Sequence, residues 1–170
     1  MYFVKIEGRT YKCSYFKRLR VIIIKSIHQI MQLIGRLDAH VADDFEGQDL
    51  DFKQWSLKTE DNIRKMVEYA ICMANGGGGS VVFGIADGVK GHSKTILGVP
   101  DHLDIAYFHQ RVFEETRPQL SAEFDLVELD YGTGRVLIMT VDGRGGPYTF
   151  ADGKSVIRKG KECLTIEKKI

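Results

Sequence analysis

Apolar side chains recur every three to four residues in three segments of the chain, and this spacing places them on one face of an α-helix. The segments are 23–37, 59–75 and about 103–116. In the second segment we expect Thr59 to be the N-cap and Gly76 to end the helix in the left-handed conformation that glycine tolerates. The pattern therefore predicts three helices. The stripe of the first comprises Ile23, Ile27, Ile30, Ile34 and Leu37, and that of the second Ile63, Met66, Val67, Ala70, Ile71 and Ala74.

Short apolar or alternating runs predict strands around these helices. They are "DLDFKQW", "SVVFGIA", "AEFDLVELDY" and "RVLIMTVDG", and the last two, joined by "GTG", predict a β-hairpin. A small ribbon in "YTFADGKSVIRKG" is expected to turn at Asp152 and Gly153, while residues 1–12 are strand-like without a predicted partner. Helices and strands do not alternate in a strict βαβ rhythm. The sequence therefore predicts an α+β fold, a single domain with a mixed or antiparallel sheet and two to three packed helices.

The distribution of charge divides the chain into a basic N-terminal part and a remainder. At 170 residues with 44% hydrophobic residues, it can bury one core, and its net charge of +1 creates no global attraction to nucleic acid. Residues 1–37, however, hold eight lysines and arginines against Glu7 alone. We therefore expect a basic amphipathic N-terminal extension, residues 1–40, and a domain, residues 41–170. The basic stretch "FKRLR" either contacts phosphates or a membrane surface, or remains solvated while the helix packs on the domain.

The cysteines and the apolar runs bear on the cellular environment. Cys13, Cys72 and Cys163 are far apart in the chain and have no metal-ligand spacing, which is typical of a protein from a reducing compartment without a structural zinc. No secretory leader is recognisable, and the longest apolar run is far shorter than the roughly 20 residues of a membrane span. The sequence thus predicts a cytoplasmic protein without a membrane span.

Four consecutive glycines, Gly76, Gly77, Gly78 and Gly79, follow the second predicted helix. In a phosphate-binding loop the glycines precede a helix, so that backbone amides and the positive end of the helix dipole face the phosphates. Here the order is reversed, and no Gly-Lys-Ser/Thr follows. The glycines therefore predict either a tight helix-to-strand connection or a backbone that another chain segment or a ligand approaches closely.

Acidic residues precede and follow these glycines. Asp51 and Lys53 share a face of the predicted strand because side chains alternate along it, Glu46 lies shortly before, and Asp87 ends the next strand. If the two strands are neighbours, the four side chains meet. Carboxylates can hold Mg²⁺ or Mn²⁺, which activates water, and a lysine can stabilise developing negative charge. The same pattern is also expected on a solvated strand face.

Several motifs in order resemble the Schlafen AlbA-like domain family, which is also described as a divergent AAA ATP-binding domain. They are "EGQDLDFKQ", "AICMANGGGGSVVFGIAD", "ILGV", "GGPYTF" and "SVIRKGKECLTI", and they extend from about Glu46 to Ile166. The resemblance implies a nucleic-acid-binding domain of regulatory or defence-type proteins. In the Schlafen endoribonucleases, metal-binding acids occupy the positions of Glu46, Asp51 and Asp87, and Lys53 also matches. Asp51 stands where the family usually has glutamate, and the four glycines stand where it often has Thr-Asp-Gly-Gly.

The resemblance also gives a role to the basic residues near the end of the chain, which can follow a nucleic-acid backbone while an aromatic ring stacks on a base. The candidate nucleic-acid-binding residues are Arg144, Tyr148, Arg158, Lys159 and Lys161. Our hypothesis is a module that binds DNA or RNA mainly through phosphates. The alternatives are a Mg²⁺- or Mn²⁺-dependent endoribonuclease that uses Glu46, Asp51, Lys53 and Asp87, and an ATP-binding domain. A homodimer and a downstream effector domain outside this chain are compatible with each of them.

Overall fold

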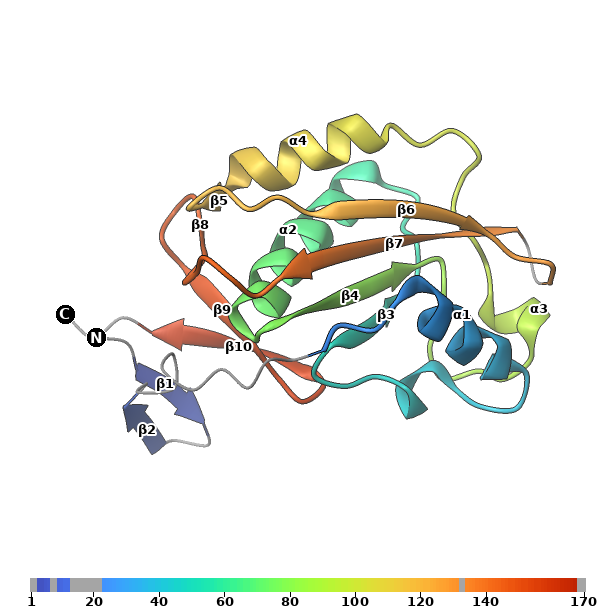
Figure 1. Cartoon of the computed structure of the whole chain (residues 1–170), viewed down its shortest axis with the longest axis horizontal. Helices are drawn as coiled ribbons and strands as arrows, with labels where there is room; N and C mark the ends of the chain where they lie inside the picture. The colour runs from blue at the N-terminus through green and yellow to red at the C-terminus, as the bar shows by residue number, and fades with distance from the viewer. Residues whose placement is uncertain (1–2, 7–8, 13–22, 132–133, 168–170) are drawn as a thin grey trace.

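The computed structural model describes residues 3–6, 9–12, 23–131 and 134–167 (Figure 1). Its central sheet has four strands in the order β3-β4-β7-β6, of which β3 and β4 run parallel and the other neighbours antiparallel. The strands are β3 (Leu50–Lys53), β4 (Gly78–Phe83), β6 (Glu123–Glu128) and β7 (Arg135–Asp142). The mixed sheet and the antiparallel β6–β7 hairpin confirm the predicted α+β class.

Each face of the central sheet is covered by helices, since its strands are apolar on both sides. Val81 and Phe83 of β4 pack toward α2 and α4, whereas Val82 between them belongs to the opposite core with α1. The helices are α1 (Ile27–Gly35), α2 (Thr59–Asn75), α3 (His92–Thr95) and α4 (Ile105–Glu115), with short 3-10 turns η2 (Arg36–Asp38) and η3 (Ala42–Asp44).

A second sheet lies beside α2, in the order β2-β1-β10-β9 with antiparallel pairs throughout (Figure 1). Its strands are β1 (Phe3–Ile6), β2 (Arg9–Lys12), β9 (Ser155–Lys159) and β10 (Glu162–Glu167). Two further short strands, β5 (Thr116–Arg117) and β8 (Thr149–Phe150), pair with each other. The predicted turn at Asp152 and Gly153 forms, but the predicted ribbon is wrong, because β9 pairs with β10 and not with the segment before that turn.

The helix boundaries correct the sequence prediction at two ends. The first helix begins at Ile27 with Ser26 as its N-cap, so Ile23 lies outside it and is 84% exposed. In α2 the predicted stripe is buried, but Thr59 is not the N-cap. Asn62 instead reaches back: its amide oxygen accepts a hydrogen bond from Ser56 N–H, and its nitrogen donates to the Ser56 carbonyl. A side chain of the first turn thus fixes the chain segment that precedes the helix, while no side chain caps the N–H groups of the first turn itself.

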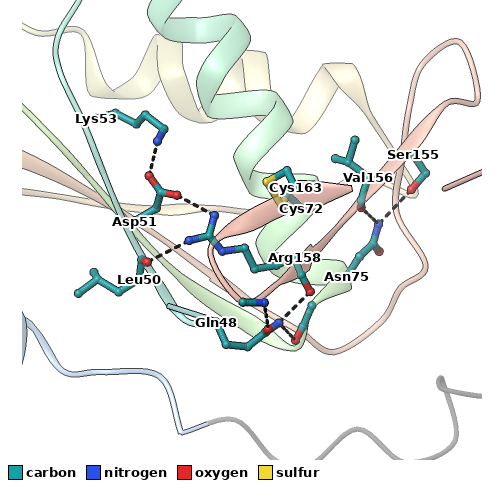
Figure 2. Close-up of a disulfide and its surroundings, with 12 residues drawn as sticks. Gln48, Leu50, Asp51, Lys53, Cys72, Asn75, Ser155, Val156, Arg158 and Cys163 are labelled. Carbon is teal, nitrogen blue, oxygen red and sulfur yellow. Dashed lines mark hydrogen bonds and ion pairs between the residues drawn. A yellow bond between two sulfur atoms is a disulfide. The ribbon is translucent and has the colours of Figure 1, made fainter. Parts of the chain in front are cut away.

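The cysteines and the apolar segments can be compared with the expectations drawn from the sequence. Cys72 of α2 and Cys163 of β10 form a disulfide across 91 positions of sequence, a bond that the sequence analysis did not predict (Figure 2). Among the described residues, no helix is long and apolar enough to cross a membrane. The basic stretch at 16–20 lies outside the described residues.

Candidate functional site

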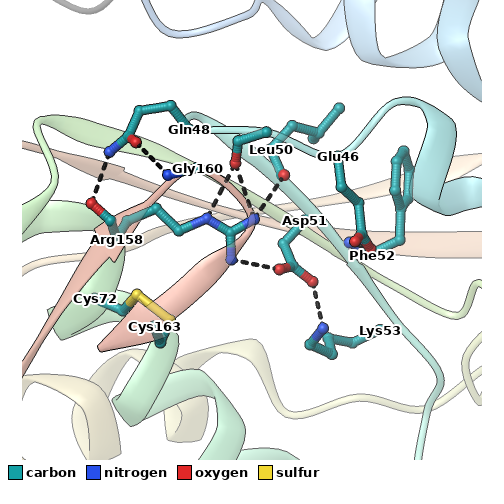
Figure 3. Close-up of polar contacts among 11 residues, drawn as sticks. Glu46, Gln48, Leu50, Asp51, Phe52, Lys53, Cys72, Arg158, Gly160 and Cys163 are labelled. Atoms are coloured by element: carbon teal, nitrogen blue, oxygen red, sulfur yellow. Dashed lines mark hydrogen bonds and ion pairs between the residues drawn. A yellow bond between two sulfur atoms is a disulfide. The ribbon is translucent and has the colours of Figure 1, made fainter. Parts of the chain in front are cut away.

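Asp51 lies in the middle of the parallel strand pair and points toward α2, because its neighbours Leu50 and Phe52 belong to the opposite core. Its carboxylate accepts a hydrogen bond of 2.7 Å from Arg158 Nη1 of β9, and the two side chains are 1% and 0% exposed. The guanidinium also donates to the carbonyls of Gly47 and Leu50 at 2.9–3.2 Å. Figure 3 shows it between Leu50 and Asp51. The ion pair therefore joins the central sheet to the second sheet.

Lys53 lies on the same face of β3, as the strand alternation predicts. It forms an ion pair with the second oxygen of Asp51, and its ammonium lies 4.8 Å from the centre of the Tyr69 ring. Burial is the largest single influence and lowers the pKa of Lys53, but the charge and hydrogen bond of Asp51, together with those of Tyr69, outweigh burial and raise the pKa above its ordinary value. Both carboxylate oxygens of Asp51 thus face a cation.

Glu46 lies close to this pair. Its carboxylate accepts a hydrogen bond from the Phe52 N–H, and burial, followed by the charge of Asp51, raises its pKa. Asp87, in contrast, is exposed in the loop after β4 and accepts a hydrogen bond from the N–H of Gly88. The structure therefore brings together Glu46, Asp51 and Lys53, but it does not add Asp87 to them.

These acids do not fit a divalent cation. Metal binding by Asp51 would place a divalent cation next to the positive charges of Arg158 and Lys53, which repel it. Across residues 3–6, 9–12, 23–131 and 134–167, no three His, Cys, Asp or Glu side chains form a group that could hold a metal ion. We therefore derive no chemical step through a metal at Glu46, Asp51 and Asp87.

The four glycines, Gly76–Gly79, form a corner against which three other segments pack; we call it the glycine corner. A Cβ at Gly76 would lie 2.6 Å from the Cβ of Arg158, one at Gly79 2.8 Å from the Asp49 carbonyl oxygen, and one at Gly143 2.2 Å from the Gly77 carbonyl carbon. The corner is thus both a tight connection and a place of close approach, and the approaching segments belong to the chain itself. The left-handed conformation occurs at Gly77 and Gly78, and not at Gly76 as predicted.

Gln48 ties the β9–β10 turn to the glycine corner, a role that no sequence pattern indicated. Its amide nitrogen donates to the Gly76 carbonyl. The same nitrogen donates to the Arg158 carbonyl, and the amide oxygen accepts a 2.8 Å hydrogen bond from the Gly160 N–H (Figure 3). One uncharged side chain thereby joins the end of α2 to both sides of the turn.

Asn75 is the second residue that sequence reasoning missed. It is buried at the end of α2, where its amide oxygen accepts from the Tyr148 N–H and its nitrogen donates to the carbonyls of Tyr148 and Val156. A polar residue that ends an apolar helical stripe was the available signal, because a buried amide needs partners of this kind.

Two of the five predicted nucleic-acid-binding residues are buried. Arg158 is occupied by Asp51, as described above. Tyr148 is 6% exposed, and its hydroxyl donates to the Arg144 carbonyl at 2.7 Å. Both side chains are therefore used within the fold, and in this structure neither is exposed for the phosphate contact predicted for Arg158 or the base stacking predicted for Tyr148.

The other three are exposed and lie around the glycine corner; we call Arg144, Lys159 and Lys161 the basic rim. Arg144 follows Gly143, which packs on Gly77, and Lys159 follows Arg158, which packs on Gly76. Arg144 forms an ion pair with Asp142, and Lys161 forms one with Asp43. Within the described part of the chain, no hydrogen bond or ion pair occupies the Lys159 side chain.

Comparison with known proteins gives two similarities. The family model described as Schlafen, AlbA_2 matches residues 46–167. A crystal structure of the DIP2311 protein from Corynebacterium diphtheriae is similar in fold, with a TM-score of 0.61 and 20% sequence identity over 82% of this chain. The match covers 26% of that chain, so this sequence spans about a quarter of its length. No curated protein matches the sequence.

Proposed function

Because the chain belongs to the Schlafen AlbA_2 domain family, we propose that it binds nucleic acid, DNA or RNA, mainly through contacts between basic side chains and phosphates. The observation that carries this proposal is the position of the basic rim. Arg144 comes from the central sheet and Lys159 and Lys161 from the second sheet, and the glycine corner brings the two segments together. Only glycines permit this approach, since a Cβ at Gly143 would collide with the Gly77 backbone and one at Gly76 with the Cβ of Arg158.

The rim can exchange its present partners for phosphates at low energetic cost. The side chains of Arg144 and Asp142 are 90% and 51% exposed, and those of Lys161 and Asp43 are 45% and 56% exposed. Ion pairs at this exposure contribute little stability, because water screens them and the long side chains lose entropy when they are held. Phosphate contacts of this kind carry no direct sequence information, so we expect weak sequence preference.

The position of the glycine corner does not favour phosphate binding by backbone amides. The glycine corner follows the C-terminal end of α2, where the helix dipole is negative, and the Gly76 carbonyl accepts a hydrogen bond from Gln48. Gly76, Gly78 and Gly79 are buried against other segments. Anion binding at this place therefore depends on side chains, and no observation favours the ATP-binding alternative.

The endoribonuclease alternative lacks a fitting metal site, as argued above, and binding without cleavage is the better-supported reading. The test is fluorescence anisotropy of a labelled 20-base-pair DNA duplex and an RNA hairpin. Three phosphate contacts predict a fall in affinity of about 40-fold between 50 and 200 mM salt. Binding that does not change with salt, or no binding to either probe, contradicts the proposal.

A further inference from the structure

The Cys72–Cys163 disulfide lies directly beside the basic rim. Cys163 is paired with Arg158 in the register of β9 and β10, and the next pair toward the turn is Lys159 with Glu162. Figure 2 shows the disulfide next to Arg158, between α2 and β10. One step along the ladder thus separates the covalent bond from a residue of the rim.

The rim is divided between two sheets, and this makes the disulfide relevant to it. Arg144 follows β7 and is anchored to the central sheet through the packing of Gly143 on Gly77, whereas Lys159 and Lys161 belong to the β9–β10 turn of the second sheet. A phosphate backbone that contacts all three needs a constant distance between the two parts.

Several contacts hold the β9–β10 turn against the central sheet and α2. The Arg158–Asp51 ion pair and the hydrogen bonds of Gln48 and Asn75 are non-covalent. In the described residues the disulfide is the one covalent link between α2 and the second sheet. Its loss leaves the turn attached but less constrained, because a cross-link limits motions that hydrogen bonds permit.

We propose that Cys72 and Cys163 form a redox switch that sets the affinity of the basic rim for nucleic acid, with tight binding in the disulfide form and weaker binding in the dithiol form. This inference rests on the proposed function. It names the regulation of the same surface.

The reaction that operates the switch is thiol–disulfide exchange with a dithiol reductant. Cys72 is fully buried and Cys163 is partly exposed, so a thiolate of the reductant attacks Sγ of Cys163. The bond between the two protein sulfurs breaks, Cys72 leaves as a thiolate and takes a proton from water, and a mixed disulfide forms at Cys163. The second thiol of the reductant then attacks its own bound sulfur, which releases Cys163 and oxidises the reductant to its disulfide.

The experiment uses the full chain with Cys13→Ser, so that Cys72 and Cys163 are its only cysteines. Binding of the 20-base-pair DNA duplex at 50 mM salt is measured for the oxidised protein and after reduction by dithiothreitol, with the thiol content of each sample determined by mass after alkylation. We expect the Kd to rise about fivefold on reduction, at the lower end of typical couplings between sites. Cys72→Ser combined with Cys163→Ser is expected to bind like the reduced protein and not to respond to dithiothreitol.

Hydrogen exchange of the β9–β10 amides separates the inference from the proposed function. Faster exchange and weaker binding on reduction support the switch. Faster exchange with an unchanged Kd, or no thiols released by dithiothreitol, overturns the switch and leaves the proposed function intact. If neither redox form binds the duplex or the RNA hairpin, both proposals are overturned.

Discussion

Arg158 Nη1 lies 2.7 Å from Asp51 Oδ2, and this ion pair, between residues 107 positions apart, is fully buried. It gives both residues a role different from the one that the sequence suggested, a phosphate contact for Arg158 and a metal ligand for Asp51. A buried charge pair is costly to disrupt on one side only, since the remaining charge loses its partner in a medium that solvates it poorly.

Replacement of Arg158 by methionine is therefore expected to lower the free energy of unfolding by about 3–5 kcal/mol, measured by urea denaturation. The combined change of Asp51→Asn and Arg158→Met is expected to cost less than the single change, because it removes both charges of the fully buried pair, and Lys53, whose side chain is 25% exposed, still reaches water. Lys159→Met, an exposed neighbour on the same strand, is the matched control and should stay within about 0.5 kcal/mol of the wild type. Equal stability of Arg158→Met and Lys159→Met would show that the pair is dispensable.

Single alanine substitutions of Arg144, Lys159 and Lys161 test the basic rim. Each should weaken binding to duplexes of different sequence by a similar factor. Each should also reduce the salt slope, the slope of log binding constant against log salt concentration, by about one unit, since each removes one phosphate contact. Lys94→Ala, an exposed residue of α3 distant from the rim in Figure 1, is the control and should leave the slope unchanged. Equal effects of the Lys94 and rim substitutions would place the binding surface elsewhere.

A cleavage assay tests the metal prediction made for Glu46, Asp51 and Asp87. Labelled structured RNA incubated with Mn²⁺ is expected to stay intact on a denaturing gel, because both oxygens of Asp51 face cations of the protein. Asp87→Ala is the comparison, and its exposed carboxylate is expected to contribute nothing to binding. Cleavage by the wild type that disappears in Asp87→Ala would establish the endoribonuclease alternative and require a rearranged site.

The raised pKa of Glu46 leads us to expect that the stability of the folded protein depends on pH. Its pKa is raised in the folded protein, first by burial and then by Asp51, so the folded state holds the proton more strongly than the unfolded chain. The folded protein therefore loses stability as the pH rises from the ordinary pKa of glutamate through the raised value. Glu46→Gln, which keeps the acceptor for the Phe52 N–H, should be more stable than the wild type at pH 7.

The gain from Glu46→Gln should shrink as the pH falls toward 4, because the wild-type carboxyl then takes up its proton in the unfolded chain as well as in the folded protein. Thermal melts at pH 4 and pH 7 measure the difference, and Asp87→Asn, at an exposed position, is the control without such a trend. A gain that is equal at both pH values contradicts the assigned pKa direction.

Close packing on the glycine corner should make Gly143→Ala far more destabilising than Gly47→Ala. Gly143→Ala places a Cβ 2.2 Å from the Gly77 carbonyl carbon, where backbone would have to move, so a loss of about 3 kcal/mol or more is expected. Gly47→Ala meets nothing within 4 Å and should be nearly neutral. Denaturant midpoints of the two variants give the comparison, and a neutral Gly143→Ala would mean that the corner is not closely packed.

Local sequence patterns predicted the elements well. The 3.6-residue period placed α2 and α4 almost at their observed ends, and the "GTG" turn between alternating strands predicted the β6–β7 hairpin. The same period extended the first helix too far, to Ile23, because periodicity does not distinguish a helical turn from an apolar residue in front of the helix. Alternation along β3 also correctly placed Asp51 and Lys53 on one face.

Local patterns could not decide which residues form the site. The sequence by itself determined where chain segments turn, which side of each is apolar and where charges gather, since these depend on neighbours within a few positions. The tertiary structure decided the pairing of Asp51 with Arg158, 107 positions apart, and the Cys72–Cys163 bond, 91 positions apart. It also decided the burial of Tyr148, whose backbone N–H is bound by Asn75. Such contacts depend on how sheets and helices pack on one another. The sequence around a charged residue does not show whether the fold exposes that residue to water or buries it beside its counter-ion.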